Sequence, residues 1–179
     1  MLKFPYKFIA IDLETTDIDP EKGSICQIGA VYVDKELNIV KTFNEYVKPL
    51  DDHRNKKAMQ VNKIEEKTLE EKGLNLHQAL GAFEFFCGDA RQLAAWGAHF
   101  DLPFLKKQYE KINRKYWFSY RHFDIKSAAI WEMARRGTPM VSGVARFCKA
   151  NGLEFEGTAH DALSDIENSV KLLQYFRDN

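Results

Sequence analysis

Apolar runs at the start of the chain predict three strands in close succession. Residues 7–12 form an apolar run, residues 25–33 are rich in β-branched side chains, and residues 40–47 alternate in polarity before Pro49. Runs of this length are typical of strands, and strands so close in sequence favour an antiparallel meander. The first third of the chain therefore predicts one sheet.

Helical spacing of apolar residues begins near residue 53 and continues to Gly88, which is placed to end the longest helix. Strands are then expected over 91–96 and 117–123, and helices from about 101–103 and over 125–136, 141–151 and 160–177. Strands that precede and then alternate with helices indicate an α/β fold, a mixed sheet flanked by helices. The length fits one domain spanning residues 1–179.

Charge and cysteine content narrow the class of protein. The 26 basic residues balance the 26 acidic ones, which argues against a protein that coats nucleic acid through bulk positive charge. Three widely spaced cysteines suggest reduced core residues, and no apolar run is long enough to span a membrane. We expect a soluble, cytoplasmic protein. The balanced net charge does not exclude an enzyme with local basic patches.

Asp12 and Glu14 put two acids on one face of the first strand, because side chains two apart on a strand project together. They could be a strand end that faces water. The apolar residues around them mark the strand as buried, however, where an unpaired carboxylate costs several kcal/mol. A divalent cation between the two acids would remove that cost.

Asp101 follows a short strand and a glycine, in the segment Gly97-Ala98-His99-Phe100-Asp101. It could simply cap the helix that begins there, a position that aspartate fills well. His99 could likewise be only a partly exposed polar residue. Asp101 is therefore a candidate metal ligand with a structural alternative.

His160 and Asp165 lie at the start of the last predicted helix, in Ala159-His160-Asp161-Ala162-Leu163-Ser164-Asp165. Residues five apart on a helix are not stacked on one face, so separate roles fit them better. Asp165 would join the other acids while His160 reaches the attacking water. An exposed histidine at a helix start is the alternative.

These residue types together indicate phosphodiester hydrolysis. Two cations about 4 Å apart can serve the attacking and the leaving oxygen. Mg²⁺ or Mn²⁺ prefers carboxylate and water ligands, which fits four acids, and a histidine can take the proton of the attacking water.

The motifs resemble those of the DnaQ-like 3′-to-5′ exonucleases of the DEDDh group: Asp12-x-Glu14, Phe100-Asp101, and His160 followed by Asp165, over residues 9 to 173. The resemblance implies an RNase H-like fold with a central five-stranded mixed sheet. It also implies two Mg²⁺ or Mn²⁺ ions held by the four acids, with His160 as general base. Residues near the substrate would be Leu13, Thr15 and Thr16 at the terminal nucleotide and His99 and Phe100 at the next one. Asp124 matches a recurrent acidic position with a structural role.

Within this group the chain resembles the RNA-trimming branch of the KapD and enhanced-RNA-interference type. Trp96-Gly97, Glu156-Gly157-Thr158 and Asn168 carry that likeness. Asp17 and Gln27 depart from the glycine and glutamate common in the group, and residues 96–101 form a stretch one residue longer than in that branch.

The predicted function is removal of 5′-mononucleotides from the 3′ end of single-stranded nucleic acid, with RNA favoured. A DNA-directed proofreading or repair exonuclease and a non-catalytic nucleic-acid-binding module are the alternatives. Relatives are often dimeric, so a homodimer or a subunit of a larger complex stays open.

Overall fold

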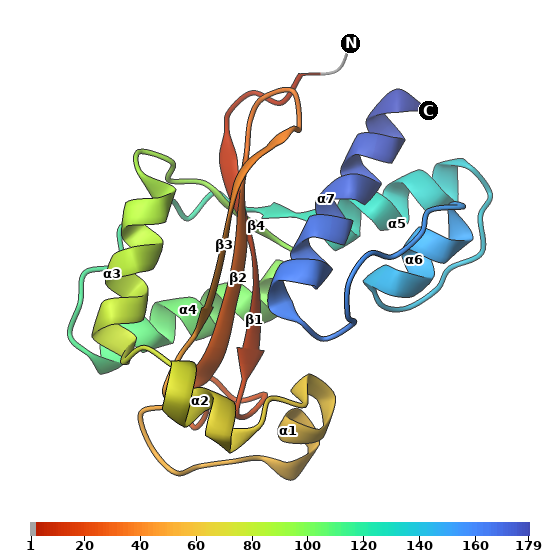
Figure 1. Cartoon of the computed structure of the whole chain (residues 1–179). Helices are drawn as coiled ribbons and strands as arrows, with labels where there is room; N and C mark the ends of the chain where they lie inside the picture. Colours follow the sequence, from red (N-terminus) through yellow and green to blue (C-terminus); the bar gives the residue numbers. More distant parts are fainter. Residues whose placement is uncertain (1–2) are drawn as a thin grey trace.

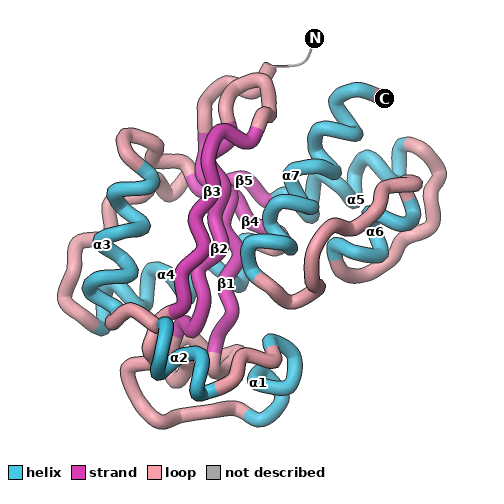
Figure 2. Tube along the Cα trace, in the orientation of Figure 1, coloured by secondary structure: helices cyan, strands magenta, loops and turns pink. Residues whose placement is uncertain are grey.

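A five-stranded mixed sheet runs through the centre of the computed structural model, which describes residues 3–179 (Figures 1 and 2). Its strands are β1 (Phe8–Thr15), β2 (Ile25–Val33), β3 (Ile39–Tyr46), β4 (Leu93–Ala95) and β5 (Phe123–Asp124), in the spatial order β3-β2-β1-β4-β5. The first three strands pair antiparallel, and β4 runs parallel to both β1 and β5. β1 is thus the central strand, with a partner on each side.

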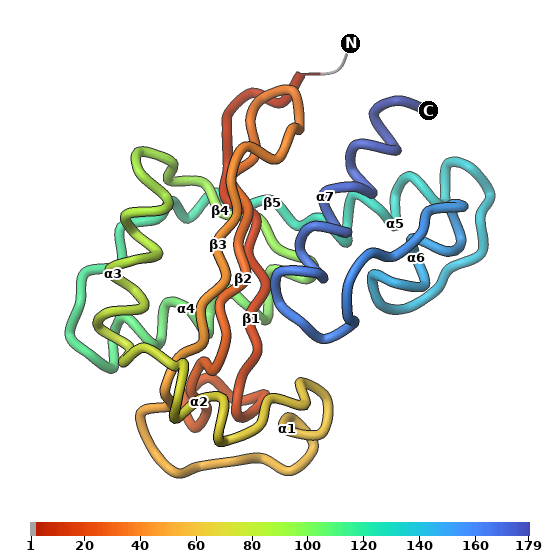
Figure 3. The backbone as a smooth tube through the Cα atoms, in the orientation of Figure 1, coloured from red at the N-terminus to blue at the C-terminus, as the bar shows by residue number. Residues whose placement is uncertain are grey.

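Helices cover both faces of the sheet. They are α1 (Lys56–Asn62), α2 (Glu66–Lys72), α3 (Leu76–Cys87), α4 (Ala98–Lys111), α5 (Ile125–Arg135), α6 (Val144–Ala150) and α7 (Ala162–Asp178). α3 and α4 lie on one side of the sheet and α5, α6 and α7 on the other, while α1 and α2 close one end (Figure 1). The C-terminus lies at the opposite end (Figure 3).

The alternation of β1 side chains builds two separate cores. Ile9, Ile11 and Leu13 pack with residues of α3 and α4. Phe8 and Ala10 pack with residues of α5 and α7. Since side chains two apart share a face, Asp12 and Glu14 continue the row that faces α7.

The structure confirms the antiparallel meander and the five-stranded mixed sheet flanked by helices. The predicted strand over residues 117–123 is wrong except for its last residue, since β5 covers only Phe123–Asp124. The apolar run before it is a loop whose Phe118 is buried against α3 and α4. Burial of that side chain, rather than strand pairing, explains the run.

α4 begins earlier than expected, at Ala98 rather than near 101–103. Gly97 precedes it in a left-handed conformation with φ 84°, which glycine adopts at little cost. The turn after β4 is therefore tight, and Asp101 and Pro103 lie within the helix. Within residues 3–179, no helix combines the length and apolar character needed to cross a bilayer.

Candidate active site

The two acids of β1 point into the space between the sheet and the start of α7. Glu14 is 8 % exposed and Asp12 is partly buried, and their neighbours on both sides of the strand belong to the cores. The alternative that these acids sit at a strand end in open water is wrong for Glu14. Its burial is dictated by the position of β1 in the middle of the sheet.

Asp101 joins α4 to β1. It lies in the first turn of α4, is 3 % exposed, and its Oδ1 accepts a hydrogen bond of 3.0 Å from the main-chain N–H of Leu13. The alternative that Asp101 caps the helix is wrong, because Gly97 occupies the cap position. This hydrogen bond holds the Asp101 carboxylate at Leu13, the residue between Asp12 and Glu14.

α7 brings the last acid and the histidine. Asp161 caps α7 by accepting from the Ser164 N–H at 3.0 Å, so the helix begins at Ala162 rather than at His160 as predicted. Asp165 lies in its first turn. His160 precedes the cap with φ 66°, and its main-chain N–H donates to Asp165 Oδ2 at 3.0 Å.

These elements converge on one point. The donor atoms of Glu14, His160 and Asp165 lie within 4.8 Å of one another. Asp12, His160 and Asp165 also line one cavity of about 460 Å³. Residues from β1 and the start of α7, up to 153 positions apart in the chain, thus form one cluster. Asp101 of α4 belongs to it as well, because its carboxylate contributes to the raised pKa of both Asp12 and Glu14.

Burial and mutual repulsion make this cluster costly. Burial, together with the carboxylates of Asp165 and Asp101, raises the pKa of Glu14 to about 8. Burial also raises the pKa of Asp101 to about 7, although the Leu13 N–H opposes the shift. The pKa of Asp12 lies well above its usual range because of burial and then of Asp101 and Glu14. Burial raises the pKa of Asp165 as well, against the His160 N–H.

The donor set fits hard divalent cations. No lysine or arginine is among the main groups that shift the pKa of these four acids within the described chain. Buried carboxylates without a protein cation gain most from a bound metal ion, and oxygen ligands of this kind suit Mg²⁺ and Mn²⁺.

A small apolar cavity adjoins Glu14. It has a volume of about 200 Å³ and is lined by Leu13, Thr15 and Phe100 together with Lys57 and Val61 of α1. Three of the five predicted substrate-binding residues therefore lie beside the acidic cluster.

The other two predicted substrate-binding residues lie elsewhere. The Thr16 side chain is fully buried, and its hydroxyl accepts from the Ser24 N–H at 2.9 Å. His99 is exposed and lines a separate cavity of about 700 Å³ with Tyr116, Tyr120 and His122. The structure does not bring His99 and Phe100 to the same cavity, so a shared contact with one nucleotide is not supported.

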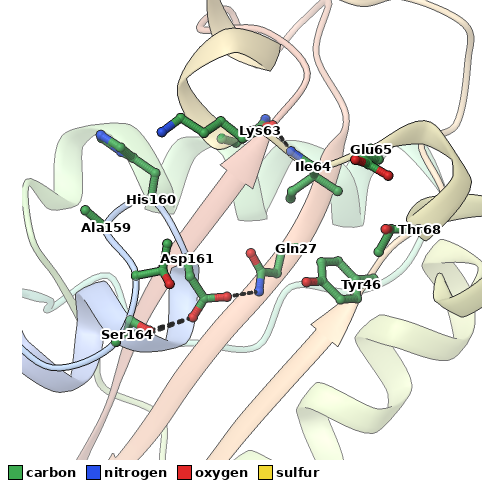
Figure 4. A pocket seen from close by; sticks show the side chains of 13 residues that line it. Gln27, Tyr46, Lys63, Ile64, Glu65, Thr68, Ala159, His160, Asp161 and Ser164 are labelled. Carbon is green, nitrogen blue, oxygen red and sulfur yellow. Dashed lines mark hydrogen bonds between the residues drawn. The ribbon is translucent and has the colours of Figure 1, made fainter.

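Two residues outside the predicted catalytic set support the elements that carry the site. Asp124 caps α5 and its Oδ2 accepts from the Ala98 N–H at 2.9 Å, which fixes the start of α4, so its structural role is confirmed. Gln27 of β2 contacts the cap residue of α7, at the floor of a further cavity of about 490 Å³ beside His160 (Figure 4). Only the departure of Gln27 from the residue common in the group marked it in the sequence.

A family model described as an exonuclease matches residues 9–173. The chain belongs to this exonuclease family. The oligoribonuclease of Xanthomonas oryzae pv. oryzae is 28 % identical over 183 residues, which cover 96 % of this chain and 87 % of the relative.

Solved structures of exonucleases share the fold. E. coli exonuclease I bound to single-stranded DNA matches with a TM-score of 0.83 and 20 % identity over 97 % of this chain, and this chain spans 40 % of its length. The nuclease domain of 3′hExo, a DEDDh family member bound to rAMP, matches with a TM-score of 0.78 and 18 % identity over 97 % of this chain and 93 % of that one. These comparisons confirm an RNase H-like fold and a 3′-to-5′ exonuclease of the DnaQ-like class. That family depends on divalent metal, and the cluster of Glu14, His160 and Asp165 offers such an ion a site in this chain. The KapD-type branch stays a prediction.

Proposed function

We propose that this exonuclease removes nucleotides one at a time from the 3′ end of short single-stranded RNA. The convergence of Glu14, His160 and Asp165 within 4.8 Å carries the proposal for the site. The likeness to oligoribonucleases supports RNA as the main substrate and short strands as its form. Residues 1–179 would form a single exonuclease domain.

Asp12, Glu14, Asp101 and Asp165 would hold two ions of Mg²⁺ or Mn²⁺. The ions would stabilise charge on the attacking and the leaving oxygen. The raised pKa values of Glu14 and Asp101 support this assignment, since a bound cation would favour the ionised form of both acids.

His160 would act as the general base. A ring nitrogen would take one proton from water as the water oxygen bonds to phosphorus and the bond to the 3′ oxygen of the preceding nucleotide breaks. That oxygen takes a proton from solvent, so the products are a 5′-mononucleotide and a strand shorter by one residue. The exposed position of His160 allows the proton to leave for solvent afterwards.

The cavity lined by Leu13, Thr15 and Phe100 would receive the terminal nucleoside. Its lining is largely apolar and suits a base or sugar, and Lys57 at its edge suits a phosphate. His99, in its separate cavity, would contact nucleotides farther from the 3′ end, and Thr16 would act only by supporting the end of β1.

Digestion of matched RNA and DNA strands tests this function. With Mg²⁺ and 5′-labelled oligonucleotides of one sequence, we expect a ladder that shortens from the 3′ end and 5′-mononucleotides as products, faster for RNA. Only the 2′-hydroxyl distinguishes the strands locally. A strand blocked by a 3′-phosphate is the matched control for direction.

Internal cuts or an untouched substrate would contradict the exonuclease proposal. A faster rate on DNA would instead favour the proofreading or repair alternative, and the proposed 3′-to-5′ hydrolysis would still hold. Analytical ultracentrifugation of the same protein measures whether it is a homodimer, and fractionation of cells measures whether it is cytoplasmic.

A further inference from the structure

The start of α7 rests directly on β2 beneath the candidate general base. Gly29 of β2 makes this approach close, because a Cβ atom there would lie 2.2 Å from the carbonyl carbon of Ala162. Gln27 lies two residues earlier on the same face and is 1 % exposed. A polar side chain therefore lies buried under the residues that carry His160.

The Gln27 amide uses each of its polar atoms. Its Nε2 donates to Asp161 Oδ2 at 2.8 Å and to Asn44 Oδ1 at 2.9 Å. Its Oε1 accepts from the Ala162 N–H at 3.4 Å. Figure 4 shows Gln27 directed at Asp161 from the strand below.

Asp161 connects Gln27 to the segment that carries His160. Its other oxygen, Oδ1, accepts from both the N–H and the hydroxyl of Ser164, at 3.0 Å and 2.9 Å. His160 is the preceding residue and holds a left-handed φ of 66°, a conformation that costs a non-glycine residue free energy. The hydrogen bonds of Asp161 and of the His160 N–H must hold the backbone in this left-handed conformation.

We propose that Gln27 is a positioning residue that acts through Asp161 to hold the His160 ring at the acidic cluster. In this chain an amide suits the position better than the glutamate common in the group, because it donates to the Asp161 carboxylate and accepts from the Ala162 N–H at once. A glutamate at position 27 would place two carboxylates against each other. This inference rests on the proposed role of His160 and adds the residue that orients it.

An exchange of charged and amide partners tests the contact. Gln27→Glu should lower kcat about tenfold with KM little changed, because a donor is lost and a like charge faces Asp161. In the double variant Gln27→Glu/Asp161→Asn, the new amide donates to Glu while its oxygen keeps the helix cap, and kcat should return to within about threefold of wild type. Gln78→Glu, exposed on α3 where the capping box tolerates glutamate, is the control for added charge.

The same Gln27→Glu change in a His160→Ala protein distinguishes a positioning role from a general loss of structure. Once His160→Ala has removed the ring, Gln27→Glu should lower the rate by less than about twofold further, because the residue acts through His160. Circular dichroism reports whether each variant is folded.

Two results would overturn the inference: an equal loss in the His160→Ala background, or no recovery in the double variant. A wild-type protein without exonuclease activity, or a fully active His160→Ala variant, would instead defeat the proposed function itself.

Discussion

The two sides of the site are held in place in different ways. Asp12 and Glu14 belong to β1, which is paired with β2 on one side and β4 on the other along a buried length. Residues 157–161 form an exposed loop in which Gly157 and His160 are both left-handed, with φ 87° and 66°. One side is rigid and electrostatically costly, and the other is accessible and conformationally costly.

This difference fits the roles proposed for each side. Metal ligands need fixed distances, and a central strand supplies them through its two-residue repeat. The proposed general base must exchange protons with solvent, which fits the position of His160 on a loop, where hydrogen bonds such as those of Asp161 and Asp165 hold the backbone. The comparison predicts that changes on the strand side will affect both metal binding and stability, while changes on the loop side will affect the rate alone.

The largest effect is expected where the acids are removed. Asp12→Ala or Asp165→Ala should lower the exonuclease rate roughly 10³-fold or more, because lost ion ligands cost several kcal/mol of transition-state stabilisation. Rates on the 5′-labelled RNA strand with saturating Mg²⁺ measure this. Asp52→Asn, an exposed position, is the control.

A fully active Asp165→Ala variant would show that the ligand assignment is wrong. Asp12 and Glu14 of the strand side would then remain as ligands together with Asp101, and the segment at the start of α7 would contribute only His160.

A smaller effect is expected on the loop side. His160→Ala should lower kcat about 10²-fold with KM little changed, since general base catalysis typically contributes at least this much. His160→Asn is the matched variant, because asparagine tolerates the left-handed backbone better than alanine does. Steady-state kinetics on the same strand would separate the two effects.

Equal losses in the two variants would assign the effect to the imidazole ring. A rate for His160→Asn near that of wild type would contradict the general base and would assign to residue 160 only a backbone role.

The strand side was predictable from the sequence and the loop side only in part. The two-residue spacing of Asp12 and Glu14 within apolar neighbours predicts both their shared face and their burial. The order of the motifs predicts that Asp101 and Asp165 join them. Local periodicity reports local geometry, and a central strand has little freedom to depart from it.

Contacts between distant segments could not be predicted in this way. Gln27 and Asp161 are separated by 134 residues, and nothing in their own neighbourhoods indicates that they meet. Thr16 looks available for substrate in the sequence but is buried by a hydrogen bond from Ser24 across the loop after β1. His160 likewise has a left-handed φ directly before the cap of α7, at the end of the helix that packs closely on Gly29, and the sequence around it does not indicate that packing.

The smallest expected effect is on stability, and it should be confined to the strand side. Burial and the neighbouring carboxylates raise the pKa of Glu14 from 4.5 to about 8 in the folded protein. The folded state therefore binds more protons than the unfolded state between these values, and the free energy of unfolding falls as pH rises through this window. Without metal, Glu14→Gln should match wild type near pH 4.5 and melt roughly 5–10 °C higher at pH 8.

Thermal melts in chelator across this pH range measure the difference, with the exposed Glu70→Gln as the control. Added Mn²⁺ or Mg²⁺ should then raise the melting temperature of wild type more than that of Glu14→Gln, because ion binding to the folded state offsets the repulsion between the acids. The melting temperature of His160→Asn should rise with metal as much as that of wild type, because the variant keeps all four acids and the loop carries no part of that electrostatic cost. A Glu14→Gln protein that melts at the wild-type temperature at every pH would mean that the four acids are already compensated within the protein. The contrast between a costly strand and a strained loop would then have no electrostatic basis.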